Sequence, residues 1–349
     1  MEASRSHKKI AVVGAGIYGT SIAITLARSG YQPVIFDPLG PIRAASHINQ
    51  LRVHAGYHYP RSEETIKEIQ LVRSGFVEKY RAALVDNVSH YYAIPISGSK
   101  TCPEEYESIC EKYGLRLKPV CPDWINFSYI AKCYEVEENI FDPDHLRTLI
   151  QQEMSELNIQ LIKRKYSYTD KADFDFTIYA TYGLSDSHIN SFKQVKLQVA
   201  EKVLTRLPDK IKNKSLVVID GPFTAFDPYG KSEFHQFGSA KYTNHWETND
   251  PAEIVPIQYR ELLNKKFNKI EFSNFELMRH EAMEVVPLVA KAKYLGSKFT
   301  LRLVEDDPAT DRRILRVVKS DSRTIHVFSG KVVSAVKAAQ DVLRLVDNE

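Results

Sequence analysis

The sequence predicts an α/β fold: a parallel-sheet nucleotide-binding domain that is discontinuous in the sequence, and a second, β-rich α+β domain. Three observations carry this prediction. Near the start of the chain, a glycine-rich turn joins a short apolar strand to a helix. The stretch 196–243 is rich in strand-forming and turn residues, which is typical of antiparallel sheet. The stretch 324–346 returns to a strand, a glycine and a helix, so the first domain resumes at the end of the chain.

The glycine-rich turn has the layout of a Rossmann-like βαβ unit. Gly14, Gly16 and Gly19 form a G-x-G-x-x-G motif, and Asp37 follows at the end of the second strand. The first glycine permits the tight turn, the second lets the backbone approach a pyrophosphate, and the third lets the helix pack on the strand. The helix start offers N–H groups to the phosphates, and Asp37 is placed to bind a ribose. The motif predicts a dinucleotide without specifying which.

The remaining elements follow from periodicity and turn residues. At the start of one helix, Asp142 or Asp144 is the expected N-cap and Pro143 the first helical residue. After an irregular stretch at 38–61, helices are expected at 63–84, 103–113 and 332–346. Strands are expected at 91–96, 175–180, 299–304, 314–318 and 324–328.

Composition excludes several classes of protein. The 349 residues carry a net charge of +3 without a basic tract, so nucleic acid is not an expected partner. No run of about 18 apolar residues occurs, and the polar start leads into a core strand, so neither a transmembrane segment nor a signal peptide is expected. A cytoplasmic location is therefore predicted. The four cysteines form no C-x-x-C pair, so no metal site is predicted.

Four segments together resemble the D-amino-acid oxidase superfamily of FAD-dependent oxidoreductases. This superfamily includes glycine and sarcosine oxidases and the flavin-linked glycerol-3-phosphate and 2-hydroxyglutarate dehydrogenases. The segments are the glycine motif with Asp37, the flavin-facing stretch 46–59, the pair of stretches 141–143 and 180–183, and the stretch 329–331 that opens the last helix. The resemblance implies an FAD-binding domain at 1–85, 140–190 and 300–349, and a substrate or cap domain at 86–139 and 191–299.

The resemblance also implies which residues bind FAD. They lie at the glycine motif, in the flavin-facing stretch and at two later strand ends. The expected cofactor-binding residues are Gly14, Gly16, Ile17, Tyr18, Gly19, Asp37, Ser46, Asn49, Arg52, Ala180, Thr181, Gly183, Ser329, Gly330, Lys331 and Val332. At the last strand end, Gly330 permits close approach, and Lys331 either adds positive charge near the flavin or is an ordinary solvent-exposed lysine.

Three departures from the superfamily pattern leave the substrate open. The ribose-binding acid is Asp37 rather than glutamate, and Ser329 replaces the first of two glycines. The superfamily's G-x-R-P motif is absent, and Arg302, Arg312 and Arg313 lie where it is expected. Because arginine binds carboxylates and phosphates in a bidentate manner, Arg302, Arg312 and Arg313 are the candidates for holding an anionic substrate, foremost Arg302 and Arg312, with Arg52 and Arg61 behind them.

The stretch 52–61 supplies the candidates for proton transfer. Histidine has a pKa suited to accepting the proton of a substrate hydroxyl, and strand-like alternation places His54 and His58 on one face. Either histidine is alternatively a covalent attachment point for the flavin, or simply structural. Tyr57 either packs on the cofactor and contributes to the catalytic site, or fills the core. Tyr229 and His235, in the β-rich stretch, are weaker candidates.

The sequence thus predicts an FAD-dependent oxidoreductase that moves a hydride from a CH–OH or CH–NH carbon of a small polar or anionic metabolite to flavin. The partner is a small-molecule substrate, and the electron acceptor stays open. Two alternatives are an NAD(P)-dependent Rossmann oxidoreductase and a non-catalytic flavin-binding protein. The late return of the chain to the nucleotide domain argues against the first, and the cluster of His, Tyr and Arg at 52–61 argues against the second.

Overall fold

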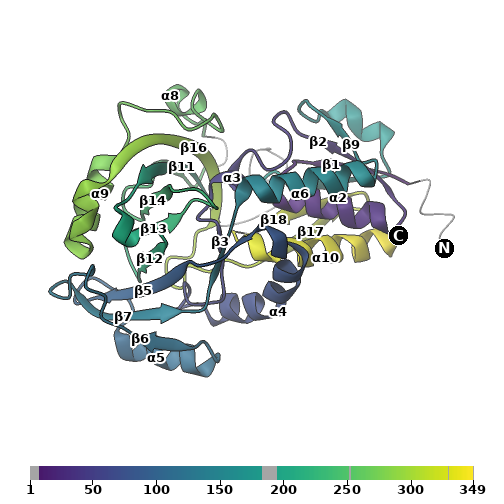
Figure 1. The fold of residues 1–349 in the computed structure, drawn as a ribbon. Helices are drawn as coiled ribbons and strands as arrows, with labels where there is room; N and C mark the ends of the chain where they lie inside the picture. Colours follow the sequence, from purple (N-terminus) through teal and green to yellow (C-terminus); the bar gives the residue numbers. More distant parts are fainter. Residues whose placement is uncertain (1–7, 183–194, 251–252, 329, 349) are drawn as a thin grey trace.

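The computed structural model describes residues 8–182, 195–250, 253–328 and 330–348, and Figure 1 shows them arranged as two lobes. One lobe contains a mostly parallel sheet with helices on it, and the other a large, mostly antiparallel sheet. The predicted α/β fold with a second, β-rich domain is therefore confirmed.

The first sheet is assembled from three distant stretches of the chain. Its strands, in spatial order, are β17 (Arg316–Asp321), β18 (Thr324–Phe328), β10 (Phe176–Tyr179), β1 (Lys9–Val13), β2 (Gln32–Phe36) and β9 (Gln160–Ile162). All neighbouring pairs are parallel except the β17–β18 hairpin. Because carboxyl ends of parallel strands lie at one edge, the turns that follow β1, β10 and β18 come together there.

Helices cover this sheet. They are α2 (Ile17–Arg28), α4 (Glu63–Lys79), α6 (Pro143–Glu156) and α10 (Ala335–Asp347), and α10 packs along α2 (Figure 1). The side chain of Asp142 accepts a hydrogen bond from the backbone N–H of His145 at 2.7 Å, so Asp142 is the N-cap of α6 and Pro143 its first residue.

Two helices are shorter than predicted. The expected helix 63–84 ends at Lys79, because a 3₁₀ turn at Arg81–Ala83 leads into β4 (Leu84–Val85), which pairs with β8 (Asn139–Phe141). The expected helix 332–346 begins with a 3₁₀ turn at Val332–Ser334 before α10. In both cases contacts with other parts of the fold decide where the α-helix ends or begins, although the helical periodicity of the sequence continues further.

The second sheet is the larger one. In spatial order its strands are β15 (Asn244–Thr248), β11 (Val195–Arg206), β14 (His235–Ser239), β13 (Thr224–Pro228), β12 (Lys214–Val218), β5 (Ser89–Pro95), β7 (Ile130–Val136) and β6 (Leu117–Pro119), and β16 (Lys293–Glu305) pairs with β11. The expected antiparallel arrangement holds except between β12 and β5, which are parallel. A small third sheet joins β3 (Arg52–Val53), β8 and β4.

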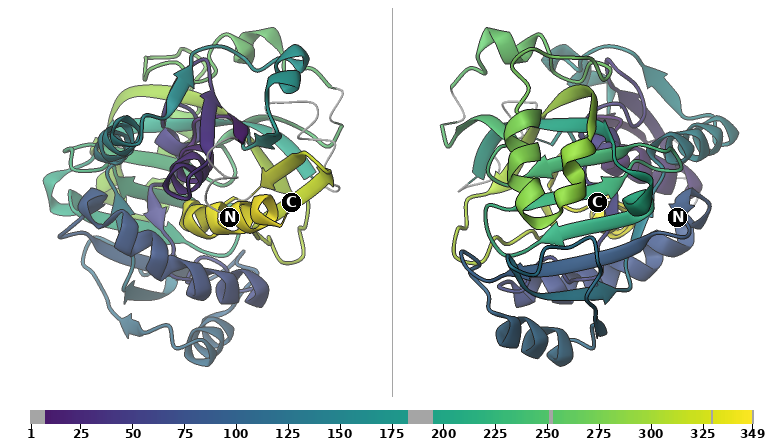
Figure 2. Two further views of the ribbon diagram at one scale, coloured as in Figure 1. Left: turned by 90° about the vertical axis from the view of Figure 1, so that its right-hand side faces the viewer. Right: turned by 60° about the vertical axis from the view of Figure 1, so that its left-hand side comes forward.

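The two faces of the second sheet differ in chemistry because alternate side chains point to opposite sides of a strand. The outer face is apolar: Val203, Phe226 and Phe237 pack with Phe275 and Met278 of α9 (Phe275–Val285). Figure 2 shows α9 lying across this face. Two further helices of the lobe are α5 (Pro103–Lys112) and the short α8 (Ile257–Arg260).

The inner face of the second sheet is polar and is connected to the first lobe. The Lys298 amine on β16 donates a hydrogen bond to the backbone carbonyl of Arg43 at 2.9 Å, just before the short helix α3 (Ala45–Ile48). Asp227 on β13 pairs with Arg52 on β3 at 2.7 Å. This face therefore forms a cover over the edge where β1, β10 and β18 end.

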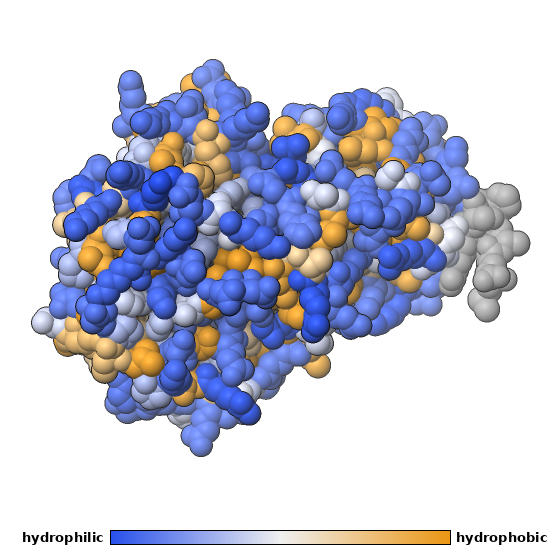
Figure 3. Space-filling view, viewed as in Figure 1, coloured by the Kyte–Doolittle hydropathy of each residue, from blue (hydrophilic) through white to orange (hydrophobic). Residues whose placement is uncertain are grey.

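The surface is mostly hydrophilic with scattered hydrophobic areas, as Figure 3 shows for one side of the molecule. Within the described ranges, no helix combines the length and the apolar character needed to cross a membrane.

Candidate active site

The glycine turn after β1 is built by close backbone contacts. A Cβ added to Gly19 would lie 1.8 Å from the carbonyl oxygen of Gly14, so the helix packs directly on the turn. Gly14 has φ +104°, and a Cβ there would lie 2.7 Å from the carbonyl oxygen of Ala180. At Gly16 an added Cβ would meet only the Ser46 hydroxyl, at 3.1 Å. The backbone at Gly16 thus borders an open space, which we call the cradle. Gly14 and Gly19 instead allow close packing against neighbouring backbone.

The start of α2 is suited to a phosphate. Gly16 is its N-cap and supplies no side-chain cap, and the first turn carries no acidic residue. The backbone N–H of Ile17 donates to the Ser46 hydroxyl at 3.0 Å. Free N–H groups and the positive end of the helix dipole favour an anion at such a terminus. Together with the cradle at Gly16, these groups fit the pyrophosphate of a dinucleotide.

Asp37 stabilises the glycine turn through hydrogen bonds to backbone N–H groups. One carboxylate oxygen accepts from the N–H of Ala15 at 2.8 Å, and the other accepts from the N–H groups of Leu39 and Gly40 at 2.7 and 2.8 Å. Because the side chain of aspartate is shorter than that of glutamate, the carboxylate lies close to the backbone N–H groups of the turn. Its predicted contact with a ribose stays a prediction.

Asn49 shapes the stretch that leads from α3 to β3. Its amide nitrogen donates to the carbonyl of Ser46 at 3.1 Å, and its oxygen accepts from the N–H of Leu51 at 2.6 Å. Leu51 adopts φ +57°. These bonds fix how the chain leaves α3 and direct the next residue, Arg52, inward.

Arg52 is the centre of a buried charge cluster. It is 1% exposed, and its guanidinium pairs with Glu138 at 2.8 Å and Asp227 at 2.7 Å. The hydroxyls of Ser215 and Tyr92 accept from it at 2.5 and 3.3 Å. Arg52 therefore joins the two lobes, and protein groups engage both of its terminal nitrogens, whereas Nε is buried without a hydrogen-bond partner among the described residues. Sequence reasoning missed Glu138, in the connection between β7 and β8, and Asp227 on β13, since neither acid belongs to a motif.

The structure brings His54 and His58 together. Their rings are stacked with centroids 5.2 Å apart, and Tyr59 contacts both rings edge-on. His54 Nδ1 lies 3.5 Å from a carboxylate oxygen of Glu138. Burial, followed by the positive charges of neighbouring groups, lowers the pKa of His58 to about 3. His58 is therefore neutral in neutral solution, whereas Glu138 can stabilise a positive charge on His54.

Tyr57 occupies a different environment. Its hydroxyl donates to the backbone carbonyl of Arg116 at 3.0 Å, and its ring packs in an apolar cluster with Tyr92, Ile94 and Tyr106. Burial raises its pKa to about 12. The structure thus gives Tyr57 a packing role, which was one of the two alternatives for this residue.

The end of β10 adjoins the glycine turn. The N–H of Ala180 donates to the carbonyl of Val13 at 2.9 Å, and Thr181 and Tyr182 follow. Tyr182 has φ +51°, and its ring stacks on Phe328 at the end of β18 with centroids 6.4 Å apart. The expected cofactor residues Gly183 and Ser329 lie outside the described residues.

Lys331 is buried, which excludes an ordinary solvent-exposed lysine. Its amine lies 3.1 Å from a carboxylate oxygen of Glu68, and burial lowers its pKa. Glu68 also accepts from the N–H of Leu315 and the hydroxyl of Ser334, both at 2.8 Å. Val332 begins the following 3₁₀ turn, and Gly330 lies against the side chain of Arg313. Glu68 on α4 therefore fixes the start of the last helix.

The two arginine candidates differ in their partners. Arg302, on the inner face of β16, donates to the Gln198 side-chain oxygen at 2.9 and 2.7 Å, and burial lowers its pKa. No carboxylate of the described residues pairs with it. Arg312 instead pairs with Glu305 at 2.8 Å and Glu64 at 3.5 Å, outside this face. Arg302 is thus available to an anionic ligand, and Arg312 is neutralised.

Arg313 lies beside Gly330, where an added Cβ would be 2.9 Å from its side chain. Besides burial, its positive charge contributes to the pKa shifts of His58, Tyr59, Tyr182 and Arg302. Tyr229 and His235 lie elsewhere: Tyr229 is within 3.3 Å of His47, and His235 packs on Phe226 in the outer half of the sheet.

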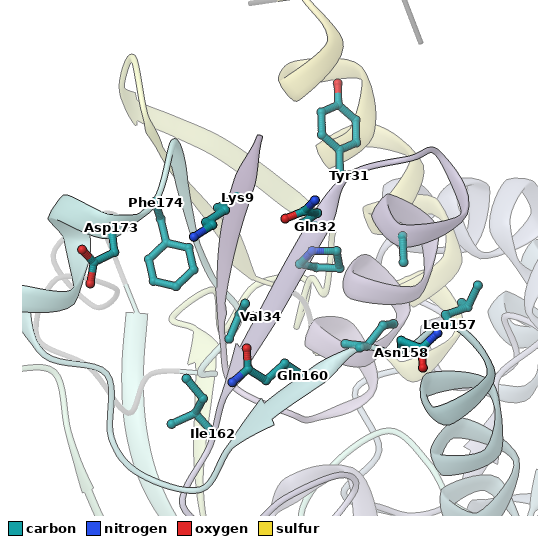
Figure 4. Close-up of a pocket in the computed structure, with 13 residues that line it drawn as sticks. Lys9, Tyr31, Gln32, Val34, Leu157, Asn158, Gln160, Ile162, Asp173 and Phe174 are labelled. Carbon is teal, nitrogen blue, oxygen red and sulfur yellow. The ribbon is translucent and has the colours of Figure 1, made fainter. Parts of the chain in front are cut away.

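Two hollows of the described surface are lined by other residues. The larger, about 590 Å³, lies beside the amino-terminal halves of β1 and β2, and Lys9, Gln32, Gln160 and Asp173 line it (Figure 4). The smaller, about 280 Å³, is lined by acidic residues and arginines of the stretch 305–316. Since the glycine turn follows the carboxyl end of β1, the larger hollow is on the opposite edge of the sheet.

Comparison with known proteins shows which proteins the chain is similar to. A family model described as FAD dependent oxidoreductase matches residues 9–130. The chain is 23% identical over 353 residues to the FAD-dependent monooxygenase FPY4 of Fusarium mangiferae, covering 97% of this chain and 91% of that protein. It is 25% identical over 379 residues to the FAD-dependent monooxygenase kojA of Aspergillus flavus, covering 97% and 86%.

Solved structures share the fold. Glycine oxidase from Geobacillus kaustophilus superposes with a TM-score of 0.72 at 12% identity, covering 98% of this chain and 95% of that chain. Amadoriase I from Aspergillus fumigatus superposes with a TM-score of 0.67 at 13% identity, covering 99% and 87%. At these identities the likeness concerns the fold, and it extends over both lobes.

Proposed function

The chain belongs to the D-amino-acid oxidase superfamily of FAD-dependent oxidoreductases, and on that premise we propose that it oxidises a CH–OH or CH–NH bond of a small polar or anionic metabolite. FAD is its cofactor, which excludes the alternative of a purely nicotinamide-dependent enzyme. When bound, FAD supplies the acceptor for the hydride that leaves the substrate carbon. The observation that carries the proposal is Arg302, a partly buried guanidinium that Gln198 orients and no described carboxylate neutralises.

The proposed roles of the chain follow from its contacts. Gly16, Ile17 and Ser46 bind the pyrophosphate at the start of α2. Arg302 binds and orients an acidic group of the substrate, since charge-assisted bidentate hydrogen bonds are strong and directional. Tyr59 and Tyr182 narrow the space between Arg302 and the histidine pair and exclude water.

We propose His54 as the proton acceptor. With Nδ1 facing Glu138, the other ring nitrogen, Nε2, is the one that can accept a proton from the substrate hydroxyl or ammonium. The Glu138 carboxylate, 3.5 Å from Nδ1, stabilises the resulting positive charge. Burial lowers the pKa of His58 to about 3, so a proton on His58 is not favoured in neutral solution.

We also propose the domain division 1–85, 140–190 and 300–349 for FAD, and 86–139 and 191–299 for the substrate. All six strands of the first sheet fall within the FAD ranges. One boundary is better placed later: β16 pairs with β11 from Lys293 to Glu305, so the chain leaves the substrate domain after Glu305. The cytoplasmic location stays a prediction.

An anaerobic screen tests the proposed function. The purified flavoprotein is mixed with hydroxy acids, amino acids and sugar-derived metabolites without oxygen, and the visible flavin band is followed. We expect an anionic hydroxy or amino compound to bleach it, and the Arg302→Leu variant to need a much higher concentration of that compound. Bleaching only by NADH or NADPH would favour a monooxygenase, the activity in the names of FPY4 and kojA, and would contradict the proposal.

A further inference from the structure

Two lysines, one buried and one partly buried, lie directly opposite each other on the inner face of the second sheet. Lys202 of β11 is in register with Lys298 of the antiparallel strand β16. Lys298 is 6% exposed, and Lys202 is partly buried. Like charges at directly opposed positions repel each other, and burial adds the cost of removing them from water. Such a pair is stable only if other groups compensate it.

The protein compensates only one of the two. The amine of Lys298 donates to the Arg43 carbonyl at 2.9 Å and lies 3.5 Å from His47. For Lys202, no hydrogen bond or ion pair is found among the residues that the structure describes. Asp227, the nearest source of negative charge for Lys202, is engaged by Arg52 at 2.7 Å. Burial and the charge of Arg302 lower the pKa of Lys202 to about 8.

A second polar side chain without a partner lies beside Lys202. Gln236 of β14 is 3% exposed, and in the described structure neither its amide nitrogen nor its amide oxygen has a hydrogen-bond partner. Gln236 is opposite Asp227 on β13 and opposite Leu204 on β11, on the same face as Lys202. Gly238 follows on β14, and a Cβ there would lie 3.8 Å from the Lys202 amine. Buried amides without partners are rare, because each costs free energy.

We propose that Lys202 and Gln236 form a second anion subsite, separate from Arg302, that selects substrates with two acidic groups. This inference rests on the proposed function, in which Arg302 binds the first acidic group. The ammonium of Lys202 and the amide N–H of Gln236 donate to one carboxylate or phosphate.

Arg302 and the proposed subsite at Lys202 lie at separate positions along the sheet. Arg302 lies four residues beyond Lys298 on β16, which corresponds to about 13 Å of strand at 3.3 Å per residue. The guanidinium of Arg302 is drawn toward β15 by Asn244 at 3.3 Å, whereas the amine of Lys202 lies over Gly238 of β14. One small acidic group cannot satisfy both cations, so a substrate with an acidic group at each end fits better.

Calorimetric titration of the FAD-loaded protein tests this subsite without turnover. Glutarate and butyrate are the probes, since they offer two carboxylates and one carboxylate on similar chains. We expect wild type to bind glutarate at least about tenfold more tightly than butyrate, the size of one charge-assisted hydrogen bond. Lys202→Met should remove that preference, and Lys202→Arg should keep part of it. Gln236→Leu should reduce it and serves as a second variant if Lys202→Met does not fold.

Lys214→Met is the matched control, because Lys214 lies on β12 of the same sheet near Tyr91 of the apolar outer side. It should keep the preference for glutarate. Equal affinities of wild type for the two probes, no binding of glutarate, or an unchanged preference in Lys202→Met would each overturn the subsite. A protein that prefers glutarate but whose flavin no metabolite bleaches would instead contradict the proposed function and leave the subsite intact.

Discussion

The hydroxyl of Tyr18 donates a hydrogen bond to the backbone carbonyl oxygen of Lys331, which lies 313 residues later in the chain. Tyr18 is in the first turn of α2, directly after the glycine cradle, and Lys331 precedes the 3₁₀ turn that leads into α10. The bond therefore joins the proposed pyrophosphate site to the strand end proposed to approach the flavin. This hydrogen bond thus connects two parts of the proposed cofactor site that lie near opposite ends of the sequence.

Tyr18→Phe is expected to weaken FAD binding about fivefold, because loss of one hydrogen bond costs about 1 kcal/mol. Fluorescence titration of the apoprotein with FAD measures this. The matched control is Tyr31→Phe, which removes a hydrogen bond to Asp347 between the far ends of α2 and α10, at 2.7 Å. The control should lower stability by a similar amount and leave FAD affinity unchanged; equal FAD affinities for all three proteins would contradict the prediction.

Gly16→Val is expected to produce a folded protein that lacks flavin. The backbone at Gly16, φ −68° and ψ −177°, is accessible to valine, so the turn can form. The valine methyl groups, however, project into the cradle beside Ser46, where the pyrophosphate is proposed to bind. The ratio of visible to ultraviolet absorbance reports flavin content. Gly75→Ala in α4, where an added Cβ has only Val336 near it at 3.8 Å, should keep full flavin content. An unaltered ratio in Gly16→Val would exclude this placement of FAD.

Arg302→Lys and Arg312→Lys should separate the two arginine candidates. Lysine keeps the charge but loses the bidentate geometry. For the metabolite found in the anaerobic screen, Arg302→Lys is expected to raise KM roughly 10- to 100-fold, because hydrogen bonds to charged groups contribute about 1.5–3 kcal/mol. Arg312→Lys should change KM less than about twofold, since Glu305 and Glu64 already hold its charge. A larger increase of KM in Arg312→Lys than in Arg302→Lys would instead indicate that the substrate binds at the stretch 305–316.

Glu138→Gln is expected to lower the free energy of unfolding by about 3 kcal/mol, as found when one partner of a buried ion pair is removed. The substitution keeps the shape of the side chain but leaves Arg52 with Asp227 as its only carboxylate. Urea denaturation of the FAD-loaded protein measures the change. Glu107→Gln, which removes a surface ion pair with Lys132 at 2.9 Å, should cost less than about 1 kcal/mol. Similar losses in the two variants would argue against the buried cluster.

Buried histidines should make the protein sensitive to acid. Burial lowers the pKa of His47, His90 and His235 to about 4 and that of His58 to about 3. Between pH 6.5 and about 4, the unfolded chain binds protons that the folded chain does not, so stability falls as the pH falls through this window. Each histidine contributes at most about 1.4 kcal/mol per pH unit. Urea denaturation between pH 7 and pH 5, run on wild type and His90→Gln, should show a shallower slope for the variant.

The cofactor-binding half of the site could be predicted from sequence because it is local. A glycine motif, a strand and a helix start fix backbone N–H groups within a few residues, and Gly14, Gly16 and Gly19 have the packing roles that the motif requires. The same holds for the cap at Asp142, which depends on neighbours three residues away. The resemblance of four segments then pointed to the superfamily, and a family model described as FAD dependent oxidoreductase matches residues 9–130.

The substrate half was decided only by tertiary structure. Arg302 and Arg312 look alike in the sequence, but Gln198 orients one and Glu305 neutralises the other. Asp227, Lys202 and Gln236 come from three separate strands, Glu138 comes from the connection between β7 and β8, and none of the four belongs to a motif. The role of each residue depends on which face of the sheet its side chain lies on, which the strand register decides. It also depends on which charged groups the fold buries next to it. Register and burial are properties of the whole fold, so the glycine motif by itself determined only that a dinucleotide binds, the four resembling segments together pointed to FAD, and the assembled sheet determined the side chains that face the site.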